Sequence, residues 1–248
     1  MPAITFVITS AGRFDLLETT LDTFLQYNSA PIARYILVED RGGEAVLSVL
    51  KKYQVQFEVF INNPPLGQIA SIDLAYKTIS TPYIFHCEDD WRFFRSGFIE
   101  ESMALLQAFP CISTVISRRH GQTPMSDLIY QGELQHYQGI AYRCAPRLVH
   151  PHWLGYSFNP GLRRLWDYQE MGSFGRWGVE IDVSIFFKRR GMTMATLEEP
   201  ACETTGRKRH VTDPTWSRDW RSHVQEKQRT LAHHMEALLH TLGIRKGR

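Results

Sequence analysis

The chain has 248 residues, of which 43% are hydrophobic and 22% are charged, and its formal net charge is +2. These values are typical of a globular protein large enough for one substantial domain. The small net charge gives no electrostatic reason to expect a nucleic-acid partner. No window contains the roughly 18 apolar residues of a transmembrane helix, and residues 1–4 do not begin a signal peptide. We therefore expect a cytoplasmic protein with no transmembrane segment.

The first third of the chain alternates between predicted strands and helices. Apolar runs rich in β-branched and aromatic residues predict the strands, and apolar residues at helical spacing predict the helices. The expected strands are 4–9, 36–38, 57–61 and 83–87, and the expected helices are 14–25, 44–53 and 68–79.

The pattern continues less regularly after residue 95. A helix is expected at 97–109, a strand at 113–117, a weaker strand at 140–143, a helix at 179–190 and a strand at 192–197. Asn159, Pro160 and Gly161 resemble a helix start, with asparagine as the cap and proline in the first helical position. A final amphipathic helix is expected at 217–242. Strands that alternate with helices predict an α/β fold, with a mostly parallel central sheet flanked by helices in a single compact unit.

Three acidic residues follow the predicted strand 83–87 directly. Glu88, Asp89 and Asp90 would repel one another unless a cation or a bound proton offset their charge. Ligands of α/β proteins collect where parallel strands end, and Mg²⁺ or Mn²⁺ prefers carboxylate oxygens. An acidic turn in solvent, close to the N-terminus of the next helix, explains the same residues. Both interpretations remain open on spacing alone.

Five segments in order resemble the GT-A-fold glycosyltransferases, most closely those of family 2, over residues 3–212. The segments are 7–13, 36–40, Gly67 at a helix start, 88–90 and 177–182. The resemblance implies a single GT-A domain over 1–248, with a nucleotide-sugar-binding half at 1–95, an acceptor-binding and catalytic half at 96–212, and a C-terminal helix at 213–248. It also implies an inverting, metal-dependent transfer of a sugar from a UDP- or GDP-sugar.

The resemblance assigns donor-binding roles to residues at the strand ends. Glu88-Asp89-Asp90 takes the place of the family's DxD motif, with Asp90 as the main ligand of Mn²⁺ or Mg²⁺ and Glu88 as a second one. Late in the chain, His210 is expected as a further metal ligand, and Arg207 and Arg209 as phosphate-binding residues. The other residues expected around the nucleotide are Thr9, Ser10, Arg13, Glu39, Asp40, Gly67, Gln68, Ser71, Glu88 and Asp89.

The general base is expected in the segment that follows Trp177 and Gly178. Family 2 members place an acid about eleven residues ahead of a glycine, and counting back from Gly191 gives Glu180. Asp182 is the reserve candidate. Acids are also favoured at any helix N-terminus, so both residues have a structural explanation as well. The acceptor-side candidates are Trp91, Tyr156, Asn159, Trp177 and Gly178.

Two other functions fit parts of the pattern. A nucleotidyltransferase that makes a nucleotide sugar shares the sheet and the acid–metal chemistry, but residues 10–13 contain a single glycine where a glycine-rich loop is typical. A binding module that holds a nucleotide sugar or a glycan without turnover is the non-enzymatic alternative. The sequence does not name the acceptor, which is a glycan, a lipid-linked molecule or a protein. A basic C-terminus suggests peripheral membrane contact in the lipid-linked case.

Overall fold

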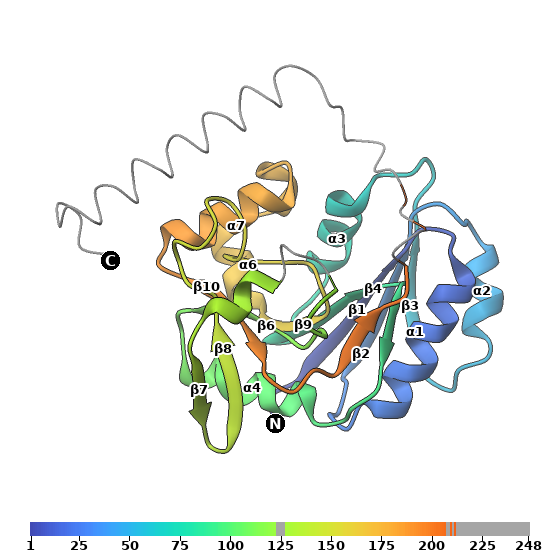
Figure 1. The fold of residues 1–248 in the computed structure, drawn as a ribbon. Coiled ribbons are helices and arrows are strands. Elements are labelled where there is room, and N and C mark those ends of the chain that lie inside the picture. The colour runs from blue at the N-terminus through green and yellow to red at the C-terminus, as the bar shows by residue number, and fades with distance from the viewer. Residues whose placement is uncertain (123–126, 207–208, 210, 212–248) are drawn as a thin grey trace.

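The structure is a computed structural model that describes residues 1–122, 127–206, 209 and 211 (Figure 1). The helix expected at 217–242 and the site candidates Arg207 and His210 lie outside the described residues. Within the described part of the chain, no helix is long and apolar enough to cross a membrane.

A nine-stranded mixed sheet forms the centre of the described structure, and its strand order is β3-β2-β1-β4-β9-β6-β10-β8-β7. The pairings of neighbours give seven of the nine strands one common direction, with β8 and β9 reversed. The sheet is therefore mostly parallel, as expected. In spatial order the strands are β3 (Phe57–Ile61), β2 (Arg34–Glu39), β1 (Ile4–Ser10), β4 (Tyr83–Glu88), β9 (Gly161–Arg164), β6 (Ile112–Ile116), β10 (Thr193–Leu197), β8 (Ile140–Cys144) and β7 (Leu134–Tyr137).

The helix start expected at Asn159–Gly161 is wrong. Residues from Gly161 form β9, which inserts antiparallel between β4 and β6. A Cβ on Gly161 would lie 2.5 Å from the carbonyl oxygen of Val115, so the close approach of the strands requires glycine here. The helix begins four residues later, as α6.

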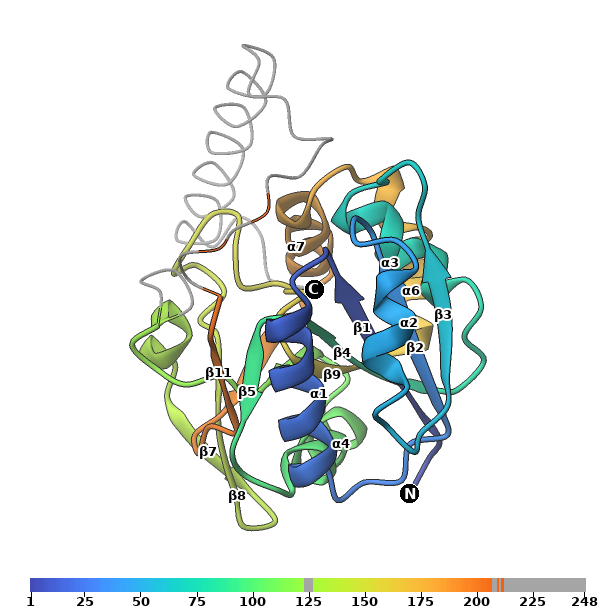
Figure 2. The same cartoon turned by 90° about the vertical axis from the view of Figure 1, so that its right-hand side faces the viewer.

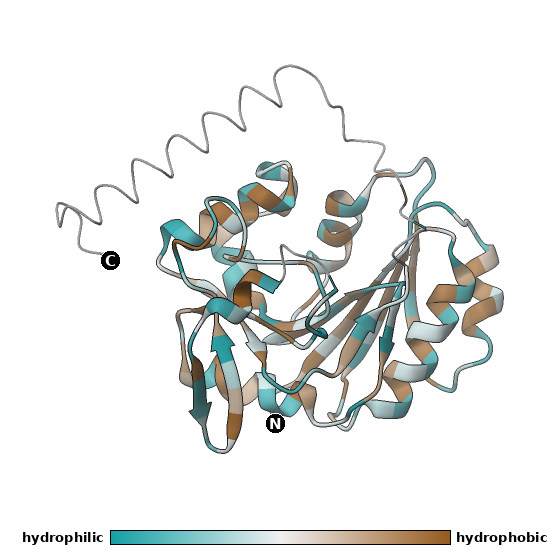
Figure 3. Cartoon of the chain, viewed as in Figure 1, coloured by the Kyte–Doolittle hydropathy of each residue, from teal (hydrophilic) through white to brown (hydrophobic). Residues whose placement is uncertain are grey.

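Helices cover both faces of the sheet, because apolar side chains point alternately to opposite sides of each strand. Phe6 and Phe85 pack in one core cluster beneath α1, α2 and α4, while Val7 and Ile84 pack in the other beneath α3, α6 and α7. Figure 3 shows the central strands mainly in hydrophobic colours. The helices are α1 (Phe14–Tyr27), α2 (Ala45–Leu50), α3 (Gln68–Tyr76), α4 (Phe98–Ala108), α6 (Leu165–Met171) and α7 (Glu180–Arg189), with 3-10 turns at Leu128–Gln131 and Phe174–Arg176.

A small second sheet connects the acidic turn to the end of the described chain. Strand β5 (Trp91–Phe93) pairs antiparallel with β11 (Cys202–Thr204), so that Trp91 faces Thr204. Figure 2 shows the two strands side by side next to α1. This pairing holds the residues that follow β11 close to Asp89 and Asp90.

Candidate active site

A cavity of about 260 Å³ lies where β1, β2 and β4 end. Parallel strands that end at one edge place their following loops together, and this edge is where α/β proteins bind ligands. The structure therefore brings together residues from both ends of the described chain, from Thr9 to Val211. The cavity is lined by Thr9, Ser10, Ala11, Arg13, Asp40, Arg41, Gly67, Gln68, Ser71, Glu88, Asp89, Asp90 and Val211.

Arg13 supplies the positive charge that the acidic turn needs. Its guanidinium forms an ion pair with Oδ1 of Asp89, and its Nη1 donates a 3.1 Å hydrogen bond to Oδ2 of Asp90. The backbone N–H of Ala11 donates to Oδ2 of Asp89 at 3.1 Å. Burial raises the pKa of Asp89 to about 6, against the lowering effect of Arg13. Arg13 thus contacts the acids, where the resemblance had placed it beside the base or ribose.

Glu88 is the acid of the turn that interacts least with Arg13. Gln68 donates from Nε2 to its Oε1 at 2.9 Å, and the indole N–H of Trp91 donates to its Oε2 at 3.2 Å. Burial raises the pKa of Glu88 to about 8, with further contributions from the negative charges of Asp90 and Glu180. The negative charge of Glu180, in the second half of the chain, therefore acts on Glu88.

Thr20 of α1 holds the backbone of the acidic turn, residues 88–90, through hydrogen bonds. The Thr20 hydroxyl accepts a 2.9 Å hydrogen bond from the backbone N–H of Trp91. It also lies 2.8 Å from the carbonyl oxygen of Asp89, to which it can donate. Thr20 is fully buried, so this clamp is shielded from water.

Asp40 and Glu39 organise loops around the cavity. Asp40 accepts from the backbone N–H groups of Leu66 at 2.7 Å and Gly67 at 3.1 Å, and so holds the loop before α3. Glu39 is fully buried and accepts from the backbone N–H of Arg41 at 2.7 Å. Asp40 lines the cavity, whereas Glu39 does not. The geometry gives Glu39 a structural role in the turn after β2, contrary to the expected contact with the nucleotide.

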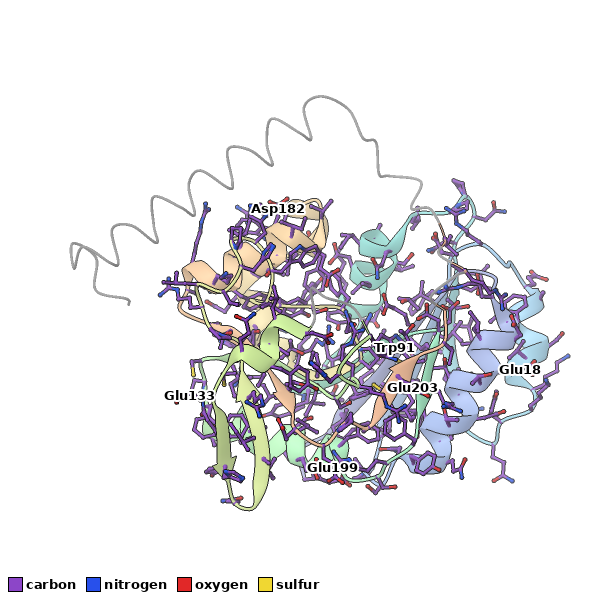
Figure 4. The ribbon with its side chains drawn as sticks, in the orientation of Figure 1. Glu18, Trp91, Glu133, Asp182, Glu199 and Glu203 are labelled. Atoms are coloured by element: carbon purple, nitrogen blue, oxygen red, sulfur yellow. The ribbon has the colours of Figure 1, made fainter. Side chains whose placement is uncertain are left out.

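Glu180 and Asp182 both lie in the first turn of α7, and the charge of Glu180 acts on Glu88. Oε1 of Glu180 accepts a 3.0 Å hydrogen bond from the backbone N–H of Phe158. Burial raises the pKa of Glu180, while the N–H of Phe158 and the hydroxyl of Ser157 lower it. Figure 4 shows Asp182 on α7, well apart from Trp91, whose indole binds Glu88.

Two of the expected acceptor-side residues are core residues. Tyr156 is 2% exposed, stacks on Phe187 with ring centroids 4.8 Å apart, and carries the guanidinium of Arg163 at 5.2 Å from its centroid. Trp91 is 3% exposed. Neither ring has a free face for a sugar, so we correct both expectations: Tyr156 packs the core and Trp91 positions Glu88.

The other acceptor-side candidates lie just before β9, in the case of Asn159, and just before α7, in the case of Trp177 and Gly178. Asn159 accepts from Nη1 of Arg118 at 2.9 Å through its side-chain oxygen. The indole of Trp177 donates to the carbonyl oxygen of Met171 at 3.3 Å and packs against Phe186. Gly178 has a φ of +90°, which favours glycine, and it directs the chain into α7.

The segment after β11 covers Asp90. The backbone N–H of Thr205 donates to the carbonyl oxygen of Asp90 at 2.8 Å, and the carbonyl oxygen of Arg209 accepts from Arg13 at 2.9 Å. The side chain of Arg209 pairs with Asp15, outside the cavity lining. The sequence had indicated this segment only through its basic residues.

Sequence reasoning missed three residues of the cavity: Ala11, Arg41 and Val211. Arg41 was detectable, because it follows the acids at the end of β2 and a phosphate-binding site needs cations. Ala11 contributes a backbone N–H, which no side-chain pattern reports. Val211 depends on the tertiary path of the chain after β11.

The residues of the acidic turn fit a divalent cation that binds through Asp90. Mn²⁺ and Mg²⁺ commonly take one or two carboxylates together with substrate phosphates. Asp90 lines the cavity, and within the described residues its carboxylate receives a hydrogen bond from Arg13 alone. Glu88 is the second carboxylate at the same wall. No group of three or more His, Cys, Asp or Glu side chains in the described ranges is placed to hold a metal ion, so a cation at Asp90 would also need oxygens from water or from substrate phosphates.

The fold is that of GT-A-type glycosyltransferases. The mannosyltransferase PcManGT from Pyrobaculum calidifontis, in complex with GDP-Man and Mn²⁺, matches with a TM-score of 0.63 and 11% identity, over 96% of this chain and 64% of that one. S. aureus TarS 1-349 in complex with UDP-GlcNAc matches with a TM-score of 0.62 and 11% identity, over 87% of this chain and 61% of that one. The chain therefore spans less than two thirds of these proteins. No protein-family model and no curated protein sequence matches the chain.

Proposed function

We propose that this protein is a metal-dependent, inverting glycosyltransferase that moves a sugar from a UDP- or GDP-sugar to an acceptor hydroxyl. One observation carries the proposal: Glu88, Asp89 and Asp90, at the end of β4, together line a cavity at the edge of the sheet. The nucleotide sugars bound to PcManGT and TarS support this class of donor.

In the proposed reaction, Glu180 accepts the proton of the acceptor hydroxyl. The acceptor oxygen forms a bond to the anomeric carbon while the bond from that carbon to the diphosphate oxygen breaks. The two events occur on opposite sides of the carbon in one displacement, so the configuration inverts. Arg13 and Arg41 line the cavity and offer positive charge to the leaving diphosphate. A divalent cation bound at Asp90 would supply further stabilisation of that charge.

Donor binding is tested by thermal shift and calorimetry with UDP, GDP, UDP-sugars and GDP-sugars, each with Mn²⁺ or with EDTA. A ligand that binds only the folded state stabilises it by RT ln(1 + [L]/Kd), where [L] is the free ligand concentration, and so raises Tm. We expect shifts only in Mn²⁺, and their loss in Asp90→Asn. Glu101→Gln on α4 removes a carboxylate that pairs with Arg95 instead, and it should retain the shift. Absence of any nucleotide shift in the wild type would contradict the proposal.

Turnover is tested by release of the nucleoside diphosphate from the donor that binds. Release in the presence of acceptors, or slow hydrolysis without them, supports a transferase. Pyrophosphate release from a nucleoside triphosphate and a sugar phosphate would indicate the nucleotidyltransferase. Tight donor binding with neither reaction would indicate the non-catalytic module.

A further inference from the structure

We propose that Arg13 is the counter-cation of the acidic turn in the metal-free protein, and that metal and donor binding pass its Nη1 group from Asp90 to the donor diphosphate. The inference rests on the proposed function and specifies how metal and donor binding are coupled. It makes Arg13 a positioning residue with two alternative partners.

The geometry places one guanidinium across two carboxylates. Nη2 pairs with Oδ1 of Asp89, Nε lies 3.4 Å from Oδ2 of Asp89, and Nη1 donates to Oδ2 of Asp90 at 3.1 Å. The Asp89 side chain is 1% exposed, that of Asp90 is 14% exposed, and that of Arg13 is 15% exposed. The contact with Asp89 is therefore the buried anchor, and the contact with Asp90 is the more accessible one.

A divalent cation at Asp90 competes with this second contact. Nη1 hydrogen-bonds Oδ2 of Asp90, so a cation that binds this oxygen has to displace Nη1 from it. The cation and the guanidinium of Arg13, both bound to one carboxylate, would also repel each other strongly in a partly buried site. Metal entry therefore favours release of Nη1, whereas Nε and Nη2 remain held by Asp89.

The released group has a suitable second partner. Arg13 lines the same cavity as Asp90, so a diphosphate held there through the metal would lie within reach of Nη1. Guanidinium groups bind phosphate oxygens with good geometry, even when one edge is already engaged. The hydrogen bond from Nη1 to the donor diphosphate then replaces the hydrogen bond to Asp90 that the metal disrupts. Nη1 also donates to the carbonyl oxygen of Arg209 at 2.9 Å, so the exchange affects the segment that covers Asp90.

The test is the affinity for Mn²⁺ alone, measured by calorimetry and by electron paramagnetic resonance of free Mn²⁺. We expect Arg13→Gln to bind Mn²⁺ about tenfold more tightly than the wild type, since about one charge-assisted hydrogen bond no longer opposes the metal. The same variant should bind UDP or GDP more weakly at saturating Mn²⁺. Arg95→Gln removes an equal charge from a pair with Glu101 and should leave both affinities unchanged.

The sign of the change separates this inference from a purely structural role. If Arg13 only maintained the turn, Arg13→Gln would weaken Mn²⁺ binding. Equal or weaker Mn²⁺ affinity in the folded variant overturns the inference, even if the wild type transfers sugar. If Arg13→Gln does not fold, Arg13→Lys provides the test. Lysine can pair with Asp89 but is too narrow to contact Asp90 at the same time, so we expect this variant to bind Mn²⁺ more tightly than the wild type does. An unchanged Mn²⁺ affinity would refute the exchange. A wild type that binds neither Mn²⁺ nor nucleotide, together with variants that bind neither, overturns both proposals.

Discussion

The backbone N–H of Phe158 donates a 3.0 Å hydrogen bond to Oε1 of Glu180. Phe158 immediately precedes the turn into β9, and Glu180 is the first residue of α7. The hydrogen bond therefore joins the segment before β9 to the start of α7. It fixes one carboxylate oxygen, and the hydroxyl of Ser157 also hydrogen-bonds this carboxylate. A general base must be held in position in this way to accept a proton from a bound hydroxyl.

Glu180→Gln should abolish transfer while donor binding is retained. Glutamine has the same shape and its side-chain oxygen can still accept from Phe158, but it cannot take a proton. We expect the transfer rate to fall by about 10²- to 10⁴-fold, with donor affinity in Mn²⁺ within about twofold of the wild type. Asp182→Asn is the matched comparison on the same helical turn and should be far less affected. Wild-type turnover in Glu180→Gln would remove the base assignment.

The metal-free protein should lose stability as the pH rises from about 4 to 8. Burial raises the pKa of Glu88 to about 8 and that of Asp89 to about 6, above their values in an unfolded chain. An acid with a raised folded-state pKa contributes stability that is complete below its unfolded pKa and lost as the pH rises through the folded pKa. In EDTA, we therefore expect Glu88→Gln to show a flatter dependence of Tm on pH than the wild type.

Mn²⁺ should oppose this loss, because the ionised carboxylates are the metal-binding form. The increase in Tm on adding Mn²⁺ should therefore grow between pH 6 and pH 8. Parallel curves for the wild type and Glu88→Gln in EDTA would show that Glu88 does not titrate in this range.

Thr20→Val should destabilise the acidic turn. Valine has nearly the same shape but cannot accept from the backbone N–H of Trp91, which would remain buried and unpaired. The expected cost is about 1–3 kcal/mol of unfolding free energy, measured by urea denaturation, together with weaker Mn²⁺-dependent donor binding. Thr19→Val is the control: among the described residues the Thr19 hydroxyl donates only to the carbonyl oxygen of Asp15, within α1, and a change of less than roughly 0.5 kcal/mol is expected. Equal effects of the two substitutions would argue against the clamp.

Gly206→Ala should displace the segment that covers Asp90. A Cβ at position 206 would lie 2.6 Å from Cβ and 2.7 Å from Cγ of Asp90, too close for either residue to stay in place. Overpacking of this kind costs about 1–3 kcal/mol, which chemical denaturation can measure. In an Asp90→Gly background neither clashing carbon is present, so the cost should be smaller. Purely additive effects would contradict the contact.

The first half of the sheet could be predicted because local signals agree there. In β1 and β4, β-branched and aromatic runs end in polar residues, and the strand-end rule then places Arg13, Asp40 and Asp90 around one cavity. Strand β9 could not be predicted in this way. Its four residues contain a glycine and two arginines, and they are extended because β4 and β6 pair with them on both sides. A three-residue strand such as β5 carries too little sequence pattern to be recognised.

The donor side of the site could be predicted better than the acceptor side, again because local sequence signals exist only for the first. The donor-side residues lie where strands end, and the sequence indicates where strands end. The accessibility of Trp91 and Tyr156 depends on tertiary packing: Tyr156 is buried in the cluster beneath α7, and Trp91 is buried in the cluster on the other face of the sheet. Arg13 was expected in the cavity, yet its partners, Asp89 and Asp90, are set by the loop geometry between β1 and α1.

The position of β9 also bears on how the protein can be dissected. Residues 161–164 supply the hydrogen-bonding neighbour of β4, although β4 belongs to the first hundred residues of the chain. A fragment that ended near residue 95 would expose one edge of β4, and such an open edge invites intermolecular strand pairing. Domain swaps that join the donor half of this protein to the acceptor half of another would therefore have to carry residues 161–164 with the donor half, even though they lie far downstream in the gene.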